Sequence, residues 1–123
     1  MAAPVVSFDI AGPDLAAQRA FYSAVFDWEI AADGRFSVAA AAPLGATLRA
    51  DPADKLIYLG VPDIAAALQA IAAHGGAVDA PRFEVPGVVV LGLFRDPAGN
   101  RMGLVEMGGE GPRIPFQRKG FGY

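Results

Sequence analysis

The chain has 123 residues, 54% of them hydrophobic, which is enough for one domain with a buried core. It has no cysteine, which excludes disulfides and metal sites built from thiolates. The net charge of −3 without a basic cluster argues against nucleic-acid binding. No run of about 18 apolar residues predicts a membrane helix, and MAAPVVSFDI does not resemble a secretory signal, so we expect a cytoplasmic protein.

The first half carries the pattern of a strand, a helix and three further strands. VVSFDI is strand-like and precedes PDLAAQRAFYSAVFDW, which begins at Pro13. Asp14 is suited to cap the N-terminus of this helix, and Asp27 tolerates the left-handed conformation at its end. The strands predicted next are 27–31, 35–41 and 45–50, and Asp51-Pro52-Ala53-Asp54 is expected to be a linker.

The second half repeats this pattern. KLIYLGV precedes PDIAAALQAIAAHGGAV, which begins at Pro62, 49 residues after the first helical segment. Asp63 is the predicted N-cap, and His74-Gly75-Gly76 predicts the C-terminus of the helix. Strands are expected at 77–84, 88–95 and 101–107, the last two joined by a tight turn at Asp96-Pro97-Ala98-Gly99.

These elements predict one α+β domain, residues 1–107, made of two βαβββ modules at about 4–50 and 55–107. Residues 108–123 are expected to be an irregular tail whose Ile114, Phe116, Phe121 and Tyr123 dock on a surface. Alternation along the strands gives one apolar face, for example Phe8 and Ile10, and one mixed face. The apolar faces should lie under the helices, whereas the mixed faces line either a cleft or solvent.

Three motifs in order resemble the vicinal-oxygen-chelate superfamily of glyoxalase, bleomycin-resistance and extradiol-dioxygenase proteins. FYSAVFDW is similar to its FYxxxFGW helix end, with Asp27 where glycine is usual, and PDIAAALQAIAAHGG to its second-module helix. VPGVVVLGLFRDPAGNRMGLVE resembles its C-terminal motif, and the resemblance spans roughly residues 4–107. It implies paired βαβββ modules that curve sheets around a cleft, where enzymes of the family usually hold a divalent metal.

The positions that carry this metal in the family fall here on residues without suitable ligands. They are Ser7 and Leu56 in the first strands, Gly103 in the last strand, and 45–49, which contains no His, Asp or Glu. Divalent metals take His nitrogens or carboxylate oxygens at about 2.0–2.2 Å. The single histidine also excludes a two-His-one-carboxylate iron site within one subunit. We therefore expect no metal and no other cofactor, and we assign no catalytic residue.

Gly103 leaves room beside its strand, either for a bound molecule or for a tight packing contact or bulge. If the mixed face is a cleft, Ser7, Asp9, Arg49, Tyr58 and Gly103 are the expected ligand-binding residues. Arg49 and Arg101 would reach the same cleft or its rim and hold an anionic ligand. A solvated surface position is the alternative for each.

Three other residues have simpler interpretations. His74, the only histidine, is expected to cap its helix, because its cationic form would favour the helix dipole. Glu106 has the opposite parity to Gly103, so it should point away from the cleft and be exposed or paired with an arginine. Trp28 is expected in the core beneath the first helix.

The favoured function is binding of a small organic molecule without a metal, as in the bleomycin-resistance branch, in a homodimer that binds neither nucleic acid nor membrane. The alternative is a glyoxalase-like lyase or isomerase that acts on a small carbonyl compound, with Asp9 as the base. A third hypothesis is an accessory domain whose surface contacts another protein. Whether the protein is an enzyme stays open at this point.

Overall fold

The structure is a computed structural model that describes residues 5, 7–109 and 111–116. It is an α+β fold, as predicted, with two helices and a five-stranded sheet. The helices are α1 (Leu15–Phe26) and α2 (Ile64–Ala73). The strands are β1 (Tyr58–Val61), β2 (Ala77–Val85), β3 (Val89–Arg95), β4 (Arg101–Gly108) and β5 (Gly111–Pro112).

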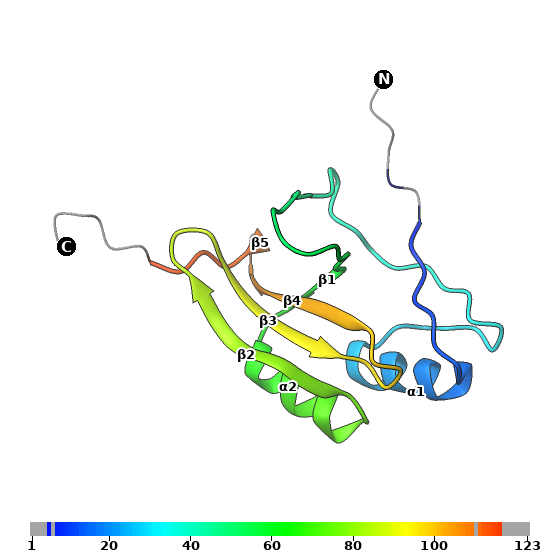
Figure 1. The fold of residues 1–123 in the computed structure, drawn as a ribbon. Coiled ribbons are helices and arrows are strands. Elements are labelled where there is room, and N and C mark those ends of the chain that lie inside the picture. The colour runs from blue at the N-terminus through cyan, green and yellow to red at the C-terminus, as the bar shows by residue number, and fades with distance from the viewer. Residues whose placement is uncertain (1–4, 6, 110, 117–123) are drawn as a thin grey trace, which may run out of the picture.

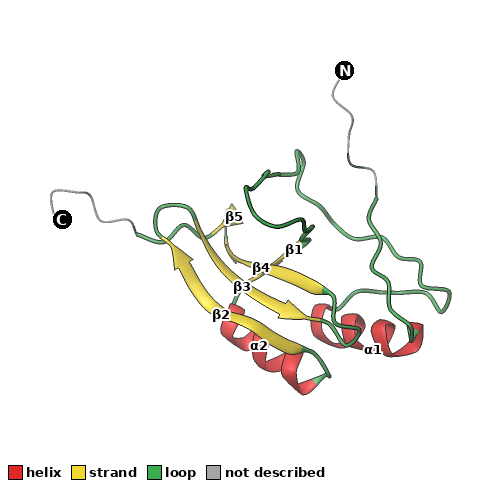
Figure 2. Ribbon diagram, in the orientation of Figure 1, coloured by secondary structure: helices red, strands yellow, loops and turns green. Residues whose placement is uncertain are grey.

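The sheet has the order β1-β4-β3-β2, with β1 parallel to β4 and the remaining pairs antiparallel. The short β5 pairs with the end of β4. Both helices lie on one side of the sheet (Figure 2), and the linker between the halves lies on the other side (Figure 1). The predicted βαβββ pattern of the second half is therefore confirmed, and its last strands begin and end within one residue of the predicted positions.

Both helices begin and end where the sequence predicts. Asp14 accepts a hydrogen bond from the backbone N–H of Ala17 at 3.0 Å, and Asp63 does the same for its own helix. α1 ends at Asp27, whose φ of 60° is left-handed. α2 ends at His74, whose Nδ1 lies 2.8 Å from the carbonyl oxygen of Ala70.

The core forms between the helices and the sheet. Strand β3 alternates between buried and half-buried residues, as a sheet covered on one side requires. Trp28 is half-buried and stacks on Tyr22 of α1 with ring centroids 5.2 Å apart, so its predicted core position is confirmed. The fully buried large side chains come from both helices and from β3 and β4, namely Phe21, Ile64, Ile71, Val90, Phe94 and Leu104.

The first half differs from the prediction. Where the structure describes the chain ahead of β1, it forms α1 and no strand, so the strands predicted at 27–31, 35–41 and 45–50 are wrong here, as is the strand-like VVSFDI over its described residues 5 and 7–10. The side chains of 37–50 are exposed, and a sheet built from them would have no buried face to stabilise it. Phe8 and Phe36 nevertheless pack on Trp28, so the apolar face of this half contacts the core as expected.

The tail adds the short β5, where an irregular chain was predicted. Ile114 and Phe116 are exposed rather than docked, and Phe121 and Tyr123 lie outside the described residues. Neither helix in the described part of the chain is long and apolar enough to cross a membrane.

Candidate functional site

The candidate site lies on the face of the sheet that the helices leave uncovered. Tyr58 on β1 and Arg101 and Val105 on β4 direct their side chains from this face, which Gly103 shares, because alternate residues of a strand lie on the same side. Met102 and Leu104 point the opposite way into the core. This is the mixed face, which the sequence predicts to line either a cleft or solvent.

Gly103 allows the ring of Tyr58 to lie directly over β4. The two residues are register partners in the parallel β1–β4 pair. A Cβ atom at position 103 would lie within 2.6 Å of Tyr58 Cε1, a distance that real Cβ atoms do not adopt. The tight packing contact is therefore the correct explanation for this glycine, and the space beside it is filled by a neighbouring side chain.

The same kind of contact occurs two residues further along the β1–β4 pair, with the roles of the two strands reversed. A Cβ atom on Gly60 of β1 would lie 2.7 Å from Cγ of Met107 on β4. Each strand thus contributes a glycine beneath a long side chain of the other strand. Tyr58 and Met107 are held flat against the sheet in this way, although Tyr58 stays 45% exposed.

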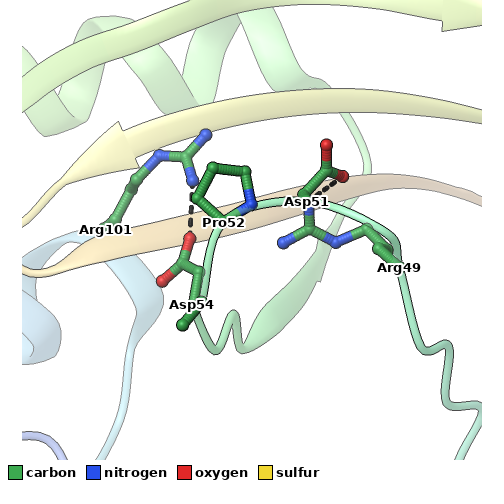
Figure 3. A pocket seen from close by; sticks show the side chains of 6 residues that line it. Arg49, Asp51, Pro52, Asp54 and Arg101 are labelled. Atoms are coloured by element: carbon green, nitrogen blue, oxygen red, sulfur yellow. Dashed lines mark hydrogen bonds and ion pairs between the residues drawn. The ribbon is translucent and has the colours of Figure 1, made fainter.

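A pocket of about 310 Å³ opens between the linker and the beginning of β4 (Figure 3). Its lining is charged, with two arginines and two aspartates around a proline. The full lining is Arg49, Asp51, Pro52, Ala53, Asp54 and Arg101. The expectation that Arg49 and Arg101 reach one cleft agrees with this geometry.

Arg101 connects the linker to the sheet through two carboxylates. Its Nη1 lies 2.7 Å from Asp54 Oδ2, and its Nε donates to Asp79 Oδ2 at 2.9 Å. The hydrogen bonds that Arg101 donates to Asp79 and Asp54 raise the pKa of Arg101. The backbone N–H of Lys55 and the Arg101 guanidinium hold the pKa of Asp54 below its ordinary value. Asp54 is thus a stable anion and a weak base.

The second ion pair of the pocket lies on the other side of Pro52 (Figure 3). Arg49 Nη1 and Asp51 Oδ2 are 2.9 Å apart, and their side chains are 41% and 54% exposed. The sequence interpretation missed Asp51 and Asp54, because it treated them only as parts of the linker between the halves. The spacing of Arg49 and Asp51, two residues apart, was the available signal for that pair.

The remaining predicted site residues lie elsewhere. Ser7 and Asp9 are exposed in the N-terminal segment and do not line the pocket. Tyr58 and Gly103 lie next to it, because Gly103 is two residues from Arg101 on the same face of β4. A role of these residues in ligand binding stays a prediction.

Glu106 points to the helix side, away from the uncovered face. Its carboxylate accepts hydrogen bonds from Arg82 at 3.0 and 3.1 Å and from the backbone N–H of Ile64 at 3.1 Å. The Arg82 hydrogen bonds, followed by the one from Ile64, lower the pKa of Glu106. The predicted direction and the pairing with an arginine are confirmed, so this residue stabilises the fold and does not face the pocket.

Asp96 is a second buried carboxylate, and the sequence interpretation gave it only a turn role. Its oxygens accept hydrogen bonds from Gln18 Nε2 and Tyr22 Oη of α1, and from backbone and side-chain N–H groups of the β3–β4 turn. Burial of the Tyr22 phenol, with the adjacent Asp96 charge, raises the pKa of Tyr22. This network fixes α1 to the turn from which Arg101 emerges.

The residues present do not fit the divalent metal that the resemblance implies. Ser7 and Leu56 lie outside any strand, and the Tyr58 ring occupies the place of a side chain at Gly103. Within the described ranges, no three His, Cys, Asp or Glu residues come close enough to hold a metal ion. We therefore derive no chemistry from a metal.

Comparison of this chain with a family profile and with solved structures identifies its family and its fold. The glyoxalase-like domain profile matches residues 6–105. No curated protein matches the sequence significantly. One similar structure is a glyoxalase-related enzyme from Fulvimarina pelagi, with a TM-score of 0.58 and 18% identity over 88% of this chain and 94% of that one.

A second similar structure is a hypothetical protein from S. aureus, with a TM-score of 0.54 and 18% identity over 76% of this chain and 85% of that one. At such identities the likeness shows the fold alone. The family match, in contrast, covers both halves of the chain and the motifs on which the resemblance depends. The chain therefore belongs to the glyoxalase-like domain family, within the vicinal-oxygen-chelate superfamily.

Proposed function

We propose that this protein binds a small organic molecule on the uncovered face of the sheet, without the divalent metal usual in the family. The observation that carries the proposal is the pocket of about 310 Å³ between the linker and the beginning of β4. Ligand pockets typically enclose about 300–1,000 Å³, so this one suits a small metabolite.

The pocket offers the two kinds of contact that such a molecule needs. Arg49 and Asp51 supply hydrogen-bond donors and acceptors that are still partly exposed. The Tyr58 ring is not part of the lining, but it lies on the same face of the sheet as Arg101 and supplies a flat apolar surface with one polar end. Polar groups of this kind fix the orientation of a ligand, whereas the ring contributes contact area.

A binding protein of the bleomycin-resistance type would act in the cytoplasm as a homodimer, and we extend both expectations to this chain by analogy with that branch. The exposed apolar side chains of the first half, such as Val38, Leu44 and Leu48, favour contact with a second copy.

The second candidate is a glyoxalase-like lyase or isomerase, and the similarity to a glyoxalase-related enzyme is the observation in its favour. Such chemistry needs a general base near the substrate. Asp9 does not line the pocket, and Asp54 has a lowered pKa, which weakens it as a base. The site therefore favours binding over catalysis.

Ligand-induced thermal stabilisation tests the proposal. We expect at least one compound from a panel of small acids, amines, amino acids and aromatic molecules to raise the melting temperature in a concentration-dependent way, because a ligand that binds only the folded state stabilises it. The shift should shrink in Tyr58→Ala and Arg49→Gln and persist in Arg35→Gln, whose side chain lies outside the pocket. A panel without any stabilising compound, or shifts that are equal in all variants, would refute it.

A further inference from the structure

We propose that the ligand is a zwitterion, a small molecule that carries a carboxylate and an ammonium group close together, as an α-amino acid with an apolar or aromatic side chain does. This inference rests on the proposed function, and it names the class of molecule that the pocket takes. It replaces the anionic ligand that the two arginines suggested from the sequence.

The charges of the pocket balance. Each arginine of the lining faces an aspartate, Arg49 with Asp51 and Arg101 with Asp54. A ligand with only a carboxylate would meet both aspartates at close range, and a ligand with only an ammonium group would meet both arginines. A molecule with both charges satisfies the two signs together, which is the ordinary requirement of electrostatic complementarity.

The two ion pairs differ in how readily they can exchange partners. Arg101 is held by Asp54 at 2.7 Å and by Asp79 at 2.9 Å, so its guanidinium is committed to the protein. The Arg49–Asp51 pair is single and about half exposed, and pairs of this kind are weak. A zwitterion can replace it without loss, because its carboxylate pairs with Arg49 while its ammonium group pairs with Asp51. The Arg49–Asp51 ion pair is then replaced by two ion pairs between the protein and the ligand.

The position of Tyr58 points to the rest of the molecule. Its ring covers Gly103, whose Cα lies roughly 6–7 Å along β4 from that of Arg101, on the same face of the sheet. An aromatic side chain of the ligand that extends along β4 from the pocket would stack on this ring. The geometry therefore favours phenylalanine-like amino acids over small ones.

Three compounds with the same ring test the proposal. We would titrate the full chain with L-phenylalanine, which has both charges, with 3-phenylpropionate, which has only the carboxylate, and with 2-phenylethylamine, which has only the ammonium group. Isothermal titration calorimetry should show L-phenylalanine binding about tenfold more tightly than either analogue.

Substitutions of pocket residues then show which side chain binds each charge of the ligand. Arg49→Gln and Asp51→Asn should each bring the affinity for L-phenylalanine down to that of the singly charged analogues. Glu29→Gln, a matched change of an exposed carboxylate to an amide outside the pocket, should leave it unchanged. The far-ultraviolet circular dichroism of each variant confirms that it is folded.

Two results would overturn the inference. If 3-phenylpropionate binds as tightly as L-phenylalanine, the pocket is an anion site, and the proposed function stands without the zwitterion. If none of the three compounds binds and no other amino acid of the wider panel does, while a singly charged or neutral compound of that panel binds, the ligand class is wrong but the function is right. If nothing in that panel binds, the proposed function itself fails.

Discussion

Replacing Asp96 by asparagine should lower the free energy of unfolding by about 3 to 4 kcal/mol, because a buried carboxylate that accepts five hydrogen bonds becomes an amide. Asp96 is 3% exposed, so water cannot replace the lost contacts. The NH₂ group of the asparagine would replace one of the two oxygens and face hydrogen-bond donors in either orientation. In one orientation these donors are the backbone N–H groups of Ala98 and Asn100, and in the other they are Gln18 Nε2 and Tyr22 Oη. The hydrogen bonds lost were charged, and such bonds are the stronger ones.

Urea denaturation at neutral pH measures this loss, and the melting temperature should fall by on the order of 10 °C. Asp9→Asn is the matched control, since this aspartate is exposed, and its stability should stay within about 0.5 kcal/mol of wild type. If the two variants were equally stable, the network between α1 and the β3–β4 turn would not fix the fold as described.

Gly103→Val should cost about 2 kcal/mol, the usual range for an overpacked site, although valine itself suits a strand. The added carbons collide with the Tyr58 ring, which must rotate away from the sheet. Because the ring is partly exposed, the chain can still fold with the ring displaced.

A double-mutant cycle with Tyr58→Ala isolates this collision. Removing the ring should restore most of the stability that Gly103→Val loses, with a coupling of about 1 kcal/mol or more between the two positions in urea denaturation. Gly45→Val provides the control, because a Cβ atom there meets nothing within 4 Å. Additive losses at positions 58 and 103 would show that the ring does not occupy the space above the glycine.

Local signals in the sequence predicted both helices and the second half well. The caps at Asp14, Asp63 and His74 and the turn before Asn100 depend on neighbouring residues, so their effects can be predicted before the fold is known. The strands of the first half were predicted from the same kind of pattern. They are absent from the described structure because pairing depends on a partner and a buried face that a local pattern does not specify.

The candidate site could be predicted only in part, for the same reason. Parity along β4 placed Gly103 and Glu106 on opposite faces, and both assignments hold. The contact of Tyr58 with Gly103 depends on the register of two parallel strands, and the Arg101–Asp54 pair joins residues 47 positions apart. Neither contact can be predicted from the residues that neighbour it in the sequence.

Metal content is the most direct test of the idea that this member of the family works without its usual ion. The protein should be produced in medium supplemented with nickel, zinc, manganese and iron salts, dialysed without a chelator, and measured by plasma mass spectrometry. We predict traces far below one ion per chain for each metal. One ion per chain that survives dialysis would contradict the account and restore a metal-dependent glyoxalase-like enzyme.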